Sequence, residues 1–372
     1  MHDVAIVGAG LAGLHCARLL ATRGLRVVLI DRKDTLAAPI HTTGIFVRKT
    51  WEDFPLPDEQ LGTPIRDVYL YSPSRRSIHL CADHDEFRVG RMEWIYLYLL
   101  DQCSRAGVQW MPSARLLRCD GTTLTVARHG RRESIAAKFI VGADGARSVV
   151  ARQLGLDRNR ELLVGLEEII ETPSRPPALH CYLDPRFAPG YIAWVVQDGP
   201  TAHVGVAGYR NRFDPARALA AFRIAAGFSR QVRTIERRGG LIPVNGILRR
   251  IATDRGLLVG DAAGAVSPLT AGGLDGAMRL SSLAADVIAA HLNGNADALR
   301  QYNGSRFRTR FVARRWMRHA IRIFDHPLAT ELAFAMLRTP PLRALAAHIF
   351  FSRGSFPDVG RALSPTEVAS RA

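Results

Sequence analysis

Short apolar runs alternate with helical stretches at the start of the chain. Residues 4–7 and 25–30 are apolar and rich in β-branched side chains, which is typical of strands buried in a parallel sheet. Residues 14–22 between them predict a helix, and Gly24 lies where that helix would end. The order of strand, helix and strand predicts a βαβ unit.

Two later apolar runs, residues 138–142 and 257–259, each lead into a turn that contains glycine and aspartate. We expect both runs to be strands. Helices are expected over residues 92–106 and over about 273–292, where the apolar positions have helical spacing.

The middle of the chain has a different pattern. Apolar residues alternate with polar ones over residues 165–170, 190–196, 203–208 and 239–243, and an Asp-Gly turn lies between the second and third of these segments. Alternation joined by such a turn is typical of antiparallel strands. We therefore expect a second, antiparallel sheet.

The C-terminal part is basic and helical in pattern. Residues 306–319 interleave arginines with aromatic residues, and residues 328–337 and 342–351 predict two short apolar helices. Two interpretations stay open. The helices dip their apolar faces into a bilayer surface with arginines on lipid phosphates, or they cover the rest of the protein and leave their arginines in solvent.

The charge of the chain is unusual for its 372 residues. Lys and Arg total 50 against 34 acidic residues, for a formal net charge of +16. Lysine occurs only at positions 33, 49 and 138, so 50 − 3 = 47 of the basic residues are arginine. These arginines either serve as ordinary solvated cations or attract an anionic lipid or phosphorylated substrate. Nucleic acid is not an expected partner, because no motif for binding it accompanies the charge.

The cysteines and the apolar segments indicate the compartment. The 5 cysteines are scattered without metal-ligand spacing, so we expect no metal site and a reduced cytoplasm. No apolar run reaches the roughly 18 residues of a membrane span, and the N-terminus lacks a secretory signal pattern. The expected location is cytoplasmic, with peripheral contact at the inner face of the membrane left open.

The first strand leads directly into a GxGxxG motif. Gly8 permits the tight turn, Gly10 lets backbone approach a pyrophosphate, and Gly13 lets the helix pack closely on the strand. The helix N-terminus offers free N–H groups to phosphates. Asp31 ends the second strand, where it would accept a ribose hydroxyl. Arg32 beside it hints at a 2′-phosphate, but the acid argues against one. The unit predicts dinucleotide binding.

Three motifs in this order, GxGxxG, Asp144-Gly145 and Gly260-Asp261, resemble the p-hydroxybenzoate-hydroxylase-type flavoproteins. The resemblance implies that FAD is the bound dinucleotide. It also implies that Asp261 hydrogen-bonds the ribityl chain. Asp144 and Gly145 would support the pyrophosphate region and a transient approach of NAD(P)H.

The same resemblance assigns further residues to the flavin. The helix that begins near Gly273 would direct its N-terminal N–H groups at the N1/C2=O edge, where reduced flavin gathers negative charge. Gly272 and Gly273 would let backbone lie flat against the ring, and Pro268 would line the same face. Arg91 matches an arginine that reaches the phosphates or the ribityl chain; alternatively, it is one solvated arginine among many.

Residues 190–196 and the loop 267–273 resemble the geranylgeranyl reductase branch of these flavoproteins, in which a YxWxFP-type strand lines a hydrophobic pocket. There are departures. Tyr191 and Trp194 are three residues apart rather than two, and Gln197 stands in place of the proline. The branch often carries Cys-Gly near the flavin, but residues 41–45 here contain no cysteine, so a catalytic cysteine cannot be transferred.

Three residues are candidates for the catalytic site. His41 lies in the loop that would approach the flavin, where it would donate a proton during hydride transfer or merely hold FAD or a turn. Tyr191 and Trp194 would wall an apolar substrate pocket or belong to the ordinary core.

The expected fold is α/β, with a Rossmann-like FAD-binding domain, an inserted antiparallel β-sheet substrate domain and a C-terminal helical cap. The expected boundaries are 1–65, 88–158 and 246–300 for the first domain, 66–87 and 159–245 for the second, and 301–372 for the cap.

The leading functional hypothesis is an FAD-dependent oxidoreductase that passes hydride to a double bond of a hydrophobic, isoprenoid-type substrate. One alternative is a flavin monooxygenase that uses NAD(P)H and O2, and another is a non-catalytic FAD-binding protein that docks on membranes. Sequence separates these poorly, because the cofactor carries the chemistry.

Overall fold

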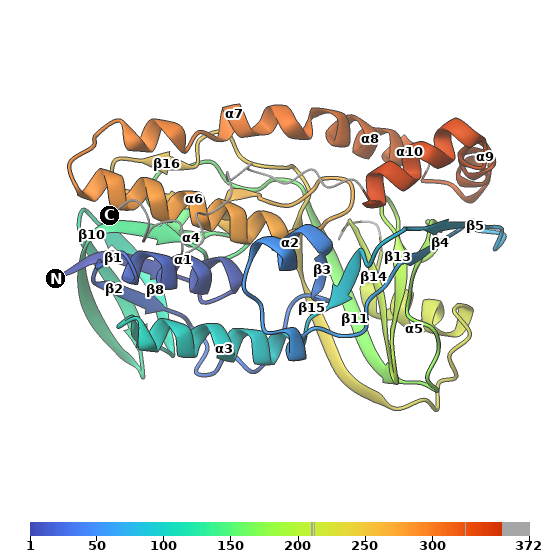
Figure 1. The fold of residues 1–372 in the computed structure, drawn as a ribbon, viewed down its shortest axis with the longest axis horizontal. Helices are drawn as coiled ribbons and strands as arrows, with labels where there is room; N and C mark the ends of the chain where they lie inside the picture. The colour runs from blue at the N-terminus through green and yellow to red at the C-terminus, as the bar shows by residue number, and fades with distance from the viewer. Residues whose placement is uncertain (210, 212, 324, 352–372) are drawn as a thin grey trace.

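The computed structural model describes residues 1–209, 211, 213–323 and 325–351. Two β-sheets lie side by side along the long axis of the molecule, and the C-terminal helices run over both of them (Figure 1). The arrangement confirms the predicted α/β class with a separate, mostly antiparallel sheet.

The first sheet combines parallel strands with an antiparallel meander. Its strands are β1 (His2–Val7), β2 (Val27–Ile30), β7 (Gln109–Met111), β8 (Ala114–Asp120), β9 (Thr123–Arg128), β10 (Arg131–Gly142), β16 (Ala252–Thr253) and β17 (Gly256–Leu258). The order is β16–β17–β10–β1–β2–β7, parallel from β17 to β7, while β8, β9 and the start of β10 form the meander. The meander lies outside the strands predicted from the sequence, because charged residues such as Arg131 and Arg132 interrupt its apolar alternation.

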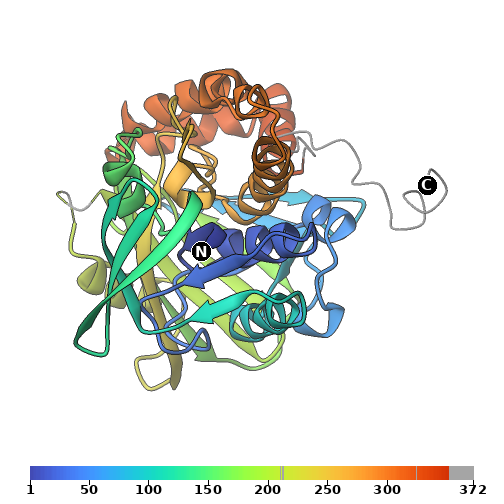
Figure 2. The same ribbon diagram turned by 90° about the vertical axis from the view of Figure 1, so that its left-hand side faces the viewer.

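Helices cover the first sheet and fix the ends of its strands. They are α1 (Leu11–Ala21), α2 (Arg48–Asp53), α3 (Met92–Arg105), α4 (Val149–Gln153) and α6 (Leu274–Leu292). Helix α1 packs between α3 and α6, as Figure 1 shows. In Figure 2 the N-terminal strand β1 lies near the middle of the part of the molecule that contains the first sheet. All of β2 and five of the six residues of β1 are buried, as their apolar runs predict.

The second sheet has seven strands. They are β4 (Asp67–Tyr71), β5 (Ser77–Cys81), β11 (Leu162–Glu171), β12 (Ala178–Tyr182), β13 (Ala193–Asp198), β14 (Thr201–Tyr209) and β15 (Thr234–Pro243). The order is β15–β11–β14–β13–β12–β4–β5, and all neighbours are antiparallel except β4 and β12. Helix α5 (Pro215–Ala225) packs on one face of this sheet through Leu219 and Phe222, and residues on the other face line a cavity.

Smaller elements join these parts. They are β3 (Ile45–Val47) paired with β6 (Phe87–Val89), and the short 3-10 helices η1 (Asp58–Gln60), η2 (Gly260–Ala263), η3 (Ala298–Gln301) and η4 (Thr309–Phe311). Each 3-10 helix is only three or four residues long, as is usual for this geometry.

The described part of the predicted cap contains α7 (Gly304–Arg308), α8 (Val312–Ile323), α9 (Pro327–Leu337) and α10 (Pro340–Phe351). Residues 352–372 of that cap lie outside the described residues. Phe334 of α9 and Ala346 of α10 are buried against the second sheet. Among the described helices, none combines the length and the apolar character that crossing a bilayer requires.

Candidate cofactor and substrate cavity

The three glycines after β1 have different surroundings. Gly8 has a φ of +105°, and a Cβ there would collide with the carbonyl oxygen of Ala143. A Cβ on Gly13 would collide with the carbonyl oxygen of Gly8, so this glycine permits the close contact of helix and strand. A Cβ on Gly10 would meet nothing within 4 Å, and no side chain caps α1 at this residue. Gly10 therefore leaves open space before the free N–H groups of α1.

Asp31 ties two turns together at the end of β2. Its Oδ2 accepts a hydrogen bond from the Ala9 N–H at 2.6 Å, and its Oδ1 accepts one from the Lys33 N–H at 2.9 Å. The carboxylate therefore fixes the shape of the glycine turn. Each oxygen keeps a further lone pair, which would accept a ribose hydroxyl.

Asp144 caps the short helix α4. It accepts the Ser148 hydroxyl at 2.5 Å and the Val149 and Val150 N–H groups at 2.6 and 3.1 Å. Burial nevertheless raises the pKa of Asp144 above its usual value. Its carboxylate thus holds the turn in place, and Gly145 beside it adopts a φ of +80°.

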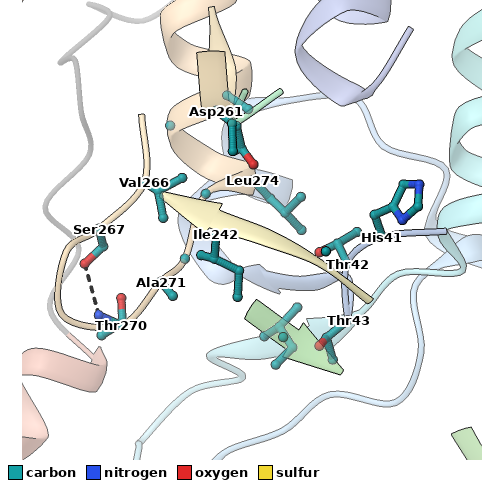
Figure 3. A pocket seen from close by; sticks show the side chains of 18 of the residues that line it. His41, Thr42, Thr43, Ile242, Asp261, Val266, Ser267, Thr270, Ala271 and Leu274 are labelled. Carbon is teal, nitrogen blue, oxygen red and sulfur yellow. Dashed lines mark hydrogen bonds between the residues drawn. The ribbon is translucent and has the colours of Figure 1, made fainter. Parts of the chain in front are cut away.

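Asp261 lines the same cavity as Asp31 and lies close to Gly273 and Leu274, where α6 begins (Figure 3). In the described part of the chain, no group hydrogen-bonds its carboxyl, and burial raises its pKa to about 6. Gly273 precedes α6 without a side-chain cap, so the helix N-terminus also lacks a side-chain partner. An uncapped helix end beside a carboxyl without a protein partner suits a ligand with both acceptors and hydroxyl donors.

One cavity of about 1560 Å³ joins these turns. It exceeds the roughly 300–1,000 Å³ of a pocket for a single small molecule, so it has room for a dinucleotide and a second ligand. The predicted site residues that line it are Gly8, Gly10, Asp31, Arg32, His41, Asp144, Gly145, Tyr191, Trp194, Gly260, Asp261, Gly272 and Gly273.

Three predicted site residues do not line the cavity. Gly13 faces Gly8 instead, in keeping with its predicted packing role. Pro268 is buried against Gly246, although both of its neighbours reach the cavity. Arg91 is exposed where α3 begins. Its contact with the cofactor therefore stays a prediction.

Glu167 on β11 carries the main polar network at the far end of the cavity, and it lines the cavity while almost fully buried. It accepts hydrogen bonds from the Thr43 hydroxyl, from Trp194 Nε1 at 2.9 Å and from His203 Nδ1 at 3.2 Å. Burial favours a higher pKa for Glu167, but the hydrogen bonds from His203, Thr43 and Trp194 outweigh it and lower the pKa. The group is therefore an ionised carboxylate.

The sheet register explains this network. Gly205 on β14 lies opposite both Glu167 on β11 and Trp194 on β13, so the three residues form a row across the sheet. The indole ring occupies the place where a side chain of residue 205 would stand. The glycine thus allows Trp194 to reach over its neighbour to the carboxylate. Strand pairing alone creates this contact between residues 27 positions apart.

His41 and Tyr191, two predicted catalytic residues, use their polar groups within the protein. His41 Nδ1 lies 2.8 Å from the Gly239 carbonyl oxygen, and because a carbonyl only accepts, Nδ1 carries the proton. The Tyr191 hydroxyl donates to the Thr270 carbonyl at 2.7 Å, and burial raises the pKa of Tyr191. Tyr191 also precedes β13 rather than lying within it. These bonds indicate that both residues shape the cavity wall.

Much of the remaining cavity wall is apolar and comes from two remote parts of the chain. Its lining residues include Leu70, Leu179 and Cys181 from the second sheet and Ala333, Phe334, Leu337, Ala346, Ile349 and Phe350 from α9 and α10. An apolar wall in the same cavity as the glycine turns suits a hydrophobic ligand.

Sequence reasoning missed Thr43, Glu167 and His203. The signal available for Glu167 was an acidic pair inside an otherwise apolar strand, Leu166-Glu167-Glu168-Ile169. No sequence pattern pointed to His203, because only the pairing of β11 with β14 brings it to Glu167.

Comparison with known proteins gives the same picture. A family described as FAD binding domain matches residues 97–318, and one described as FAD dependent oxidoreductase matches residues 3–98. Digeranylgeranylglycerophospholipid reductase 2 of Methanothermobacter thermautotrophicus is 30% identical over 308 residues, 77% of this chain and 78% of that protein. Geranylgeranyl diphosphate reductase of Rhodobacter capsulatus is 27% identical over 286 residues, 73% of this chain and 71% of that protein.

Among solved structures, a geranylgeranyl bacteriochlorophyll reductase-like protein from Thermoplasma acidophilum superposes with a TM-score of 0.77. The superposition covers 94% of this chain and 99% of that one at 20% sequence identity. At this identity the likeness shows the fold alone, and it includes the second sheet and the C-terminal helices.

Proposed function

This chain belongs to the geranylgeranyl-reductase-like branch of the p-hydroxybenzoate-hydroxylase-type FAD-dependent oxidoreductases, and from that premise we propose that it reduces a carbon–carbon double bond of a hydrophobic, isoprenoid-type substrate. The observation that carries the proposal is the single cavity. It runs without interruption from the glycine turns to an apolar chamber under α9 and α10.

The residues of the first half fit FAD. When bound, reduced FAD supplies a hydride to one alkene carbon, and a proton adds to the other. Gly10 and the N-terminus of α1 would hold the pyrophosphate, and Asp31 would hold the adenosine ribose. Asp261, without a protein partner among the described residues, would accept a ribityl hydroxyl. The N-terminus of α6 would hold the pyrimidine edge of the ring.

The Glu167 network would shape the reacting end of the cavity. With three donors directed at its carboxylate, Glu167 is a poor proton donor itself. Its role would be to fix Trp194 as a rigid wall and to orient the Thr43 hydroxyl. The apolar chamber excludes water, which keeps a reduced cofactor from unproductive reactions.

Peripheral membrane contact is part of the proposal. Leu328, Leu332 and Met336 lie four residues apart on α9 and are 75%, 66% and 56% exposed. The opposite side of the same helix lines the cavity through Ala333, Phe334 and Leu337. An apolar stripe on a protein with a net charge of +16 suits the surface of an anionic bilayer, where an isoprenoid lipid would also reside.

The arginine series 306–319 contributes less to this surface than its sequence suggests. Arg308 donates to the Ile247 carbonyl at 2.6 Å, and Arg314 lines the cavity. The outer apolar stripe of α9 is therefore the better candidate for lipid contact.

The decisive experiment is anaerobic. FAD-loaded enzyme reduced with dithionite is mixed with geranylgeranyl diphosphate or an archaeal-type unsaturated ether lipid, and the products are analysed by mass spectrometry. The proposal expects saturation of double bonds without oxygen. Product that forms only with NAD(P)H and O2 would instead support the monooxygenase, and bound flavin that no reductant and substrate together can cycle would support a non-catalytic role.

Membrane contact is tested separately by sedimentation with vesicles that contain anionic phospholipid. Replacing Leu328, Leu332 and Met336 by serine should reduce the bound fraction at least about tenfold, because each loses apolar area from the bilayer. The control replaces Ile224 and Ile235, which are also about half exposed but lie on α5 and β15. Equal binding by both variants would exclude the apolar stripe of α9 as the surface that contacts the membrane.

A further inference from the structure

Four described arginines are almost fully buried, and three of them have a carboxylate partner. Arg223 pairs with Glu168 at 2.7 Å and Arg238 with Glu236 at 2.8 Å. Arg279 lies 2.6 Å from Asp53 and 2.9 Å from Asp275. These pairs follow the rule that a buried charge is stable only with a counter-charge.

Arg318 on α8 is the exception, although it is the most buried of the four at 1% exposure. Its guanidinium lies over the rings of Tyr191 and Tyr209, 5.4 and 5.3 Å from their centres. One nitrogen donates to the Tyr209 hydroxyl at 3.2 Å, while Nε and Nη1 have no hydrogen-bond partner in the described structure. Two aromatic rings stabilise a cation but do not neutralise it.

Arg314 lies one helical turn earlier on the same side of α8 and reaches the cavity directly. Its only hydrogen bond among the described residues joins Nη1 to the Ser267 hydroxyl at 3.4 Å, which is long. Burial lowers the pKa of Arg314, and no carboxylate offsets that effect. Two inward guanidiniums thus share one helix face without an acidic partner in the part of the chain described.

Tyr191 lies between Arg318 and the cavity. Its ring lines the cavity and faces Arg318, and its hydroxyl is bound to Thr270 in the loop that also carries Ser267. At low dielectric, a charge one layer behind the wall still acts on an anion in the cavity. Arg314 and Arg318 therefore create a region of positive potential at the border of the apolar chamber.

We propose that Arg314, supported by Arg318, binds the phosphoryl head group of the substrate, so that this enzyme selects prenyl phosphates or phospholipids over uncharged prenyl alcohols. The inference rests on the proposed function and assigns the polar end of the same substrate. The FAD pyrophosphate does not serve as the anion, because its proposed place is the N-terminus of α1. The apolar lining from α9 and α10 follows α8 along the chain and would receive the prenyl tail.

The test measures binding to the oxidised, FAD-loaded enzyme, apart from catalysis. Geranylgeranyl diphosphate and geranylgeraniol are titrated into wild type, Arg314→Gln and Arg315→Gln, with flavin absorbance or calorimetry as the readout. Wild type should prefer the diphosphate. Arg314→Gln should raise its Kd about 10- to 100-fold, the range for loss of a charge-assisted hydrogen bond, and leave the Kd of the alcohol unchanged. Arg315→Gln removes the same charge from the same helix outside the cavity and should change neither Kd.

Other results overturn the inference. It fails if wild type binds alcohol and diphosphate equally, or if Arg314→Gln weakens both alike. It also fails if that variant shifts the flavin midpoint potential without changing the preference, since Arg314 would then act on the flavin. Inorganic pyrophosphate that competes fully with the prenyl compound would show a site for free phosphate instead.

The outcome also separates this inference from the proposed function. An enzyme that prefers the diphosphate but reduces no double bond keeps the head-group site and loses the proposed reaction. An enzyme that reduces the alcohol and the diphosphate equally well keeps the reaction and loses the head-group site.

Discussion

The two ends of the cavity are built in different ways. At the cofactor end, short turns after β1, β2 and β10 supply backbone N–H groups and small residues, and each turn is a continuous stretch of sequence. At the substrate end, side chains from β11, β13 and β14 meet at Glu167, and Arg318 of α8 meets Tyr191 and Tyr209, although these residues lie far apart in the chain. The first end depends on glycines and on aspartates within continuous turns, and the second depends on buried charges from separate elements.

The difference predicts which changes each end tolerates. At the cofactor end, a larger residue in place of glycine would collide with backbone. At the substrate end, a substitution that removes one partner would leave a buried charge unsatisfied. The following variants test that contrast in order of expected effect.

Glu167→Ala should have the largest effect on stability. It leaves the buried donors of His203 and Trp194 without their acceptor, and breaking such a pair typically costs about 3–5 kcal/mol. Chemical denaturation measures the loss. Glu167→Gln, which keeps the shape and one acceptor, should lose less, and both purified variants should stay yellow. A colourless Glu167→Gln protein would mean that the two ends are not independent.

Gly13→Ala should destabilise the protein by about 3 kcal/mol, at the upper end of overpacking effects, because the new Cβ would collide with backbone. Gly10→Ala is the matched control. Its Cβ meets nothing within 4 Å, so the melting temperature of the FAD-free protein should be unchanged while FAD affinity falls. Equal melting temperatures for the two FAD-free variants would contradict the packing role of Gly13.

Asp261→Asn should stabilise the FAD-free protein at neutral pH by about 2 kcal/mol. Burial raises the pKa of Asp261 to about 6, above the 3.8 of an unperturbed aspartate, so the folded state binds the proton more tightly than the unfolded state. The contribution of Asp261 to the stability of the wild type is therefore greatest below about pH 4 and is lost as the pH rises through about 6. The asparagine, which does not ionise, should remove that decline.

Denaturation of both FAD-free proteins from pH 4 to pH 8 measures the difference. The gain in stability should accompany a loss of FAD, with Asp261→Ala giving a largely colourless protein as well. Full yellow absorbance in Asp261→Ala would contradict the ribityl role, and parallel pH profiles would contradict the effect of burial.

Trp194→Phe should have the smallest effect. It removes the hydrogen bond from Nε1 to Glu167 but keeps an aromatic ring over Gly205, so the expected loss is about 1 kcal/mol. The double variant Trp194→Phe/Glu167→Gln, measured beside both single variants, gives the coupling energy of the pair. No measurable coupling would mean that Trp194 is held by packing alone.

The sequence by itself determined the cofactor end. Its signals are local, since a strand, a glycine turn, a helix and a terminal aspartate occur within 31 residues, and local backbone geometry dictates them. The sequence also determined α6 and α9, because the spacing of their apolar residues predicts the bounds of both helices to within about one residue. Contact between Arg91 and the cofactor stays a prediction, because only the tertiary structure sets the direction of a side chain just before a helix.

Only the tertiary structure decided the substrate end. The pairing of β11 with β14 and of β13 with β14 puts Gly205 between Glu167 and Trp194, and the docking of α8 buries Arg318 against Tyr191 and Tyr209. Strand register and helix docking depend on the summed packing of many apolar residues, so no short motif encodes them. Whether a buried charge is stabilised depends on the partners that this packing places beside it.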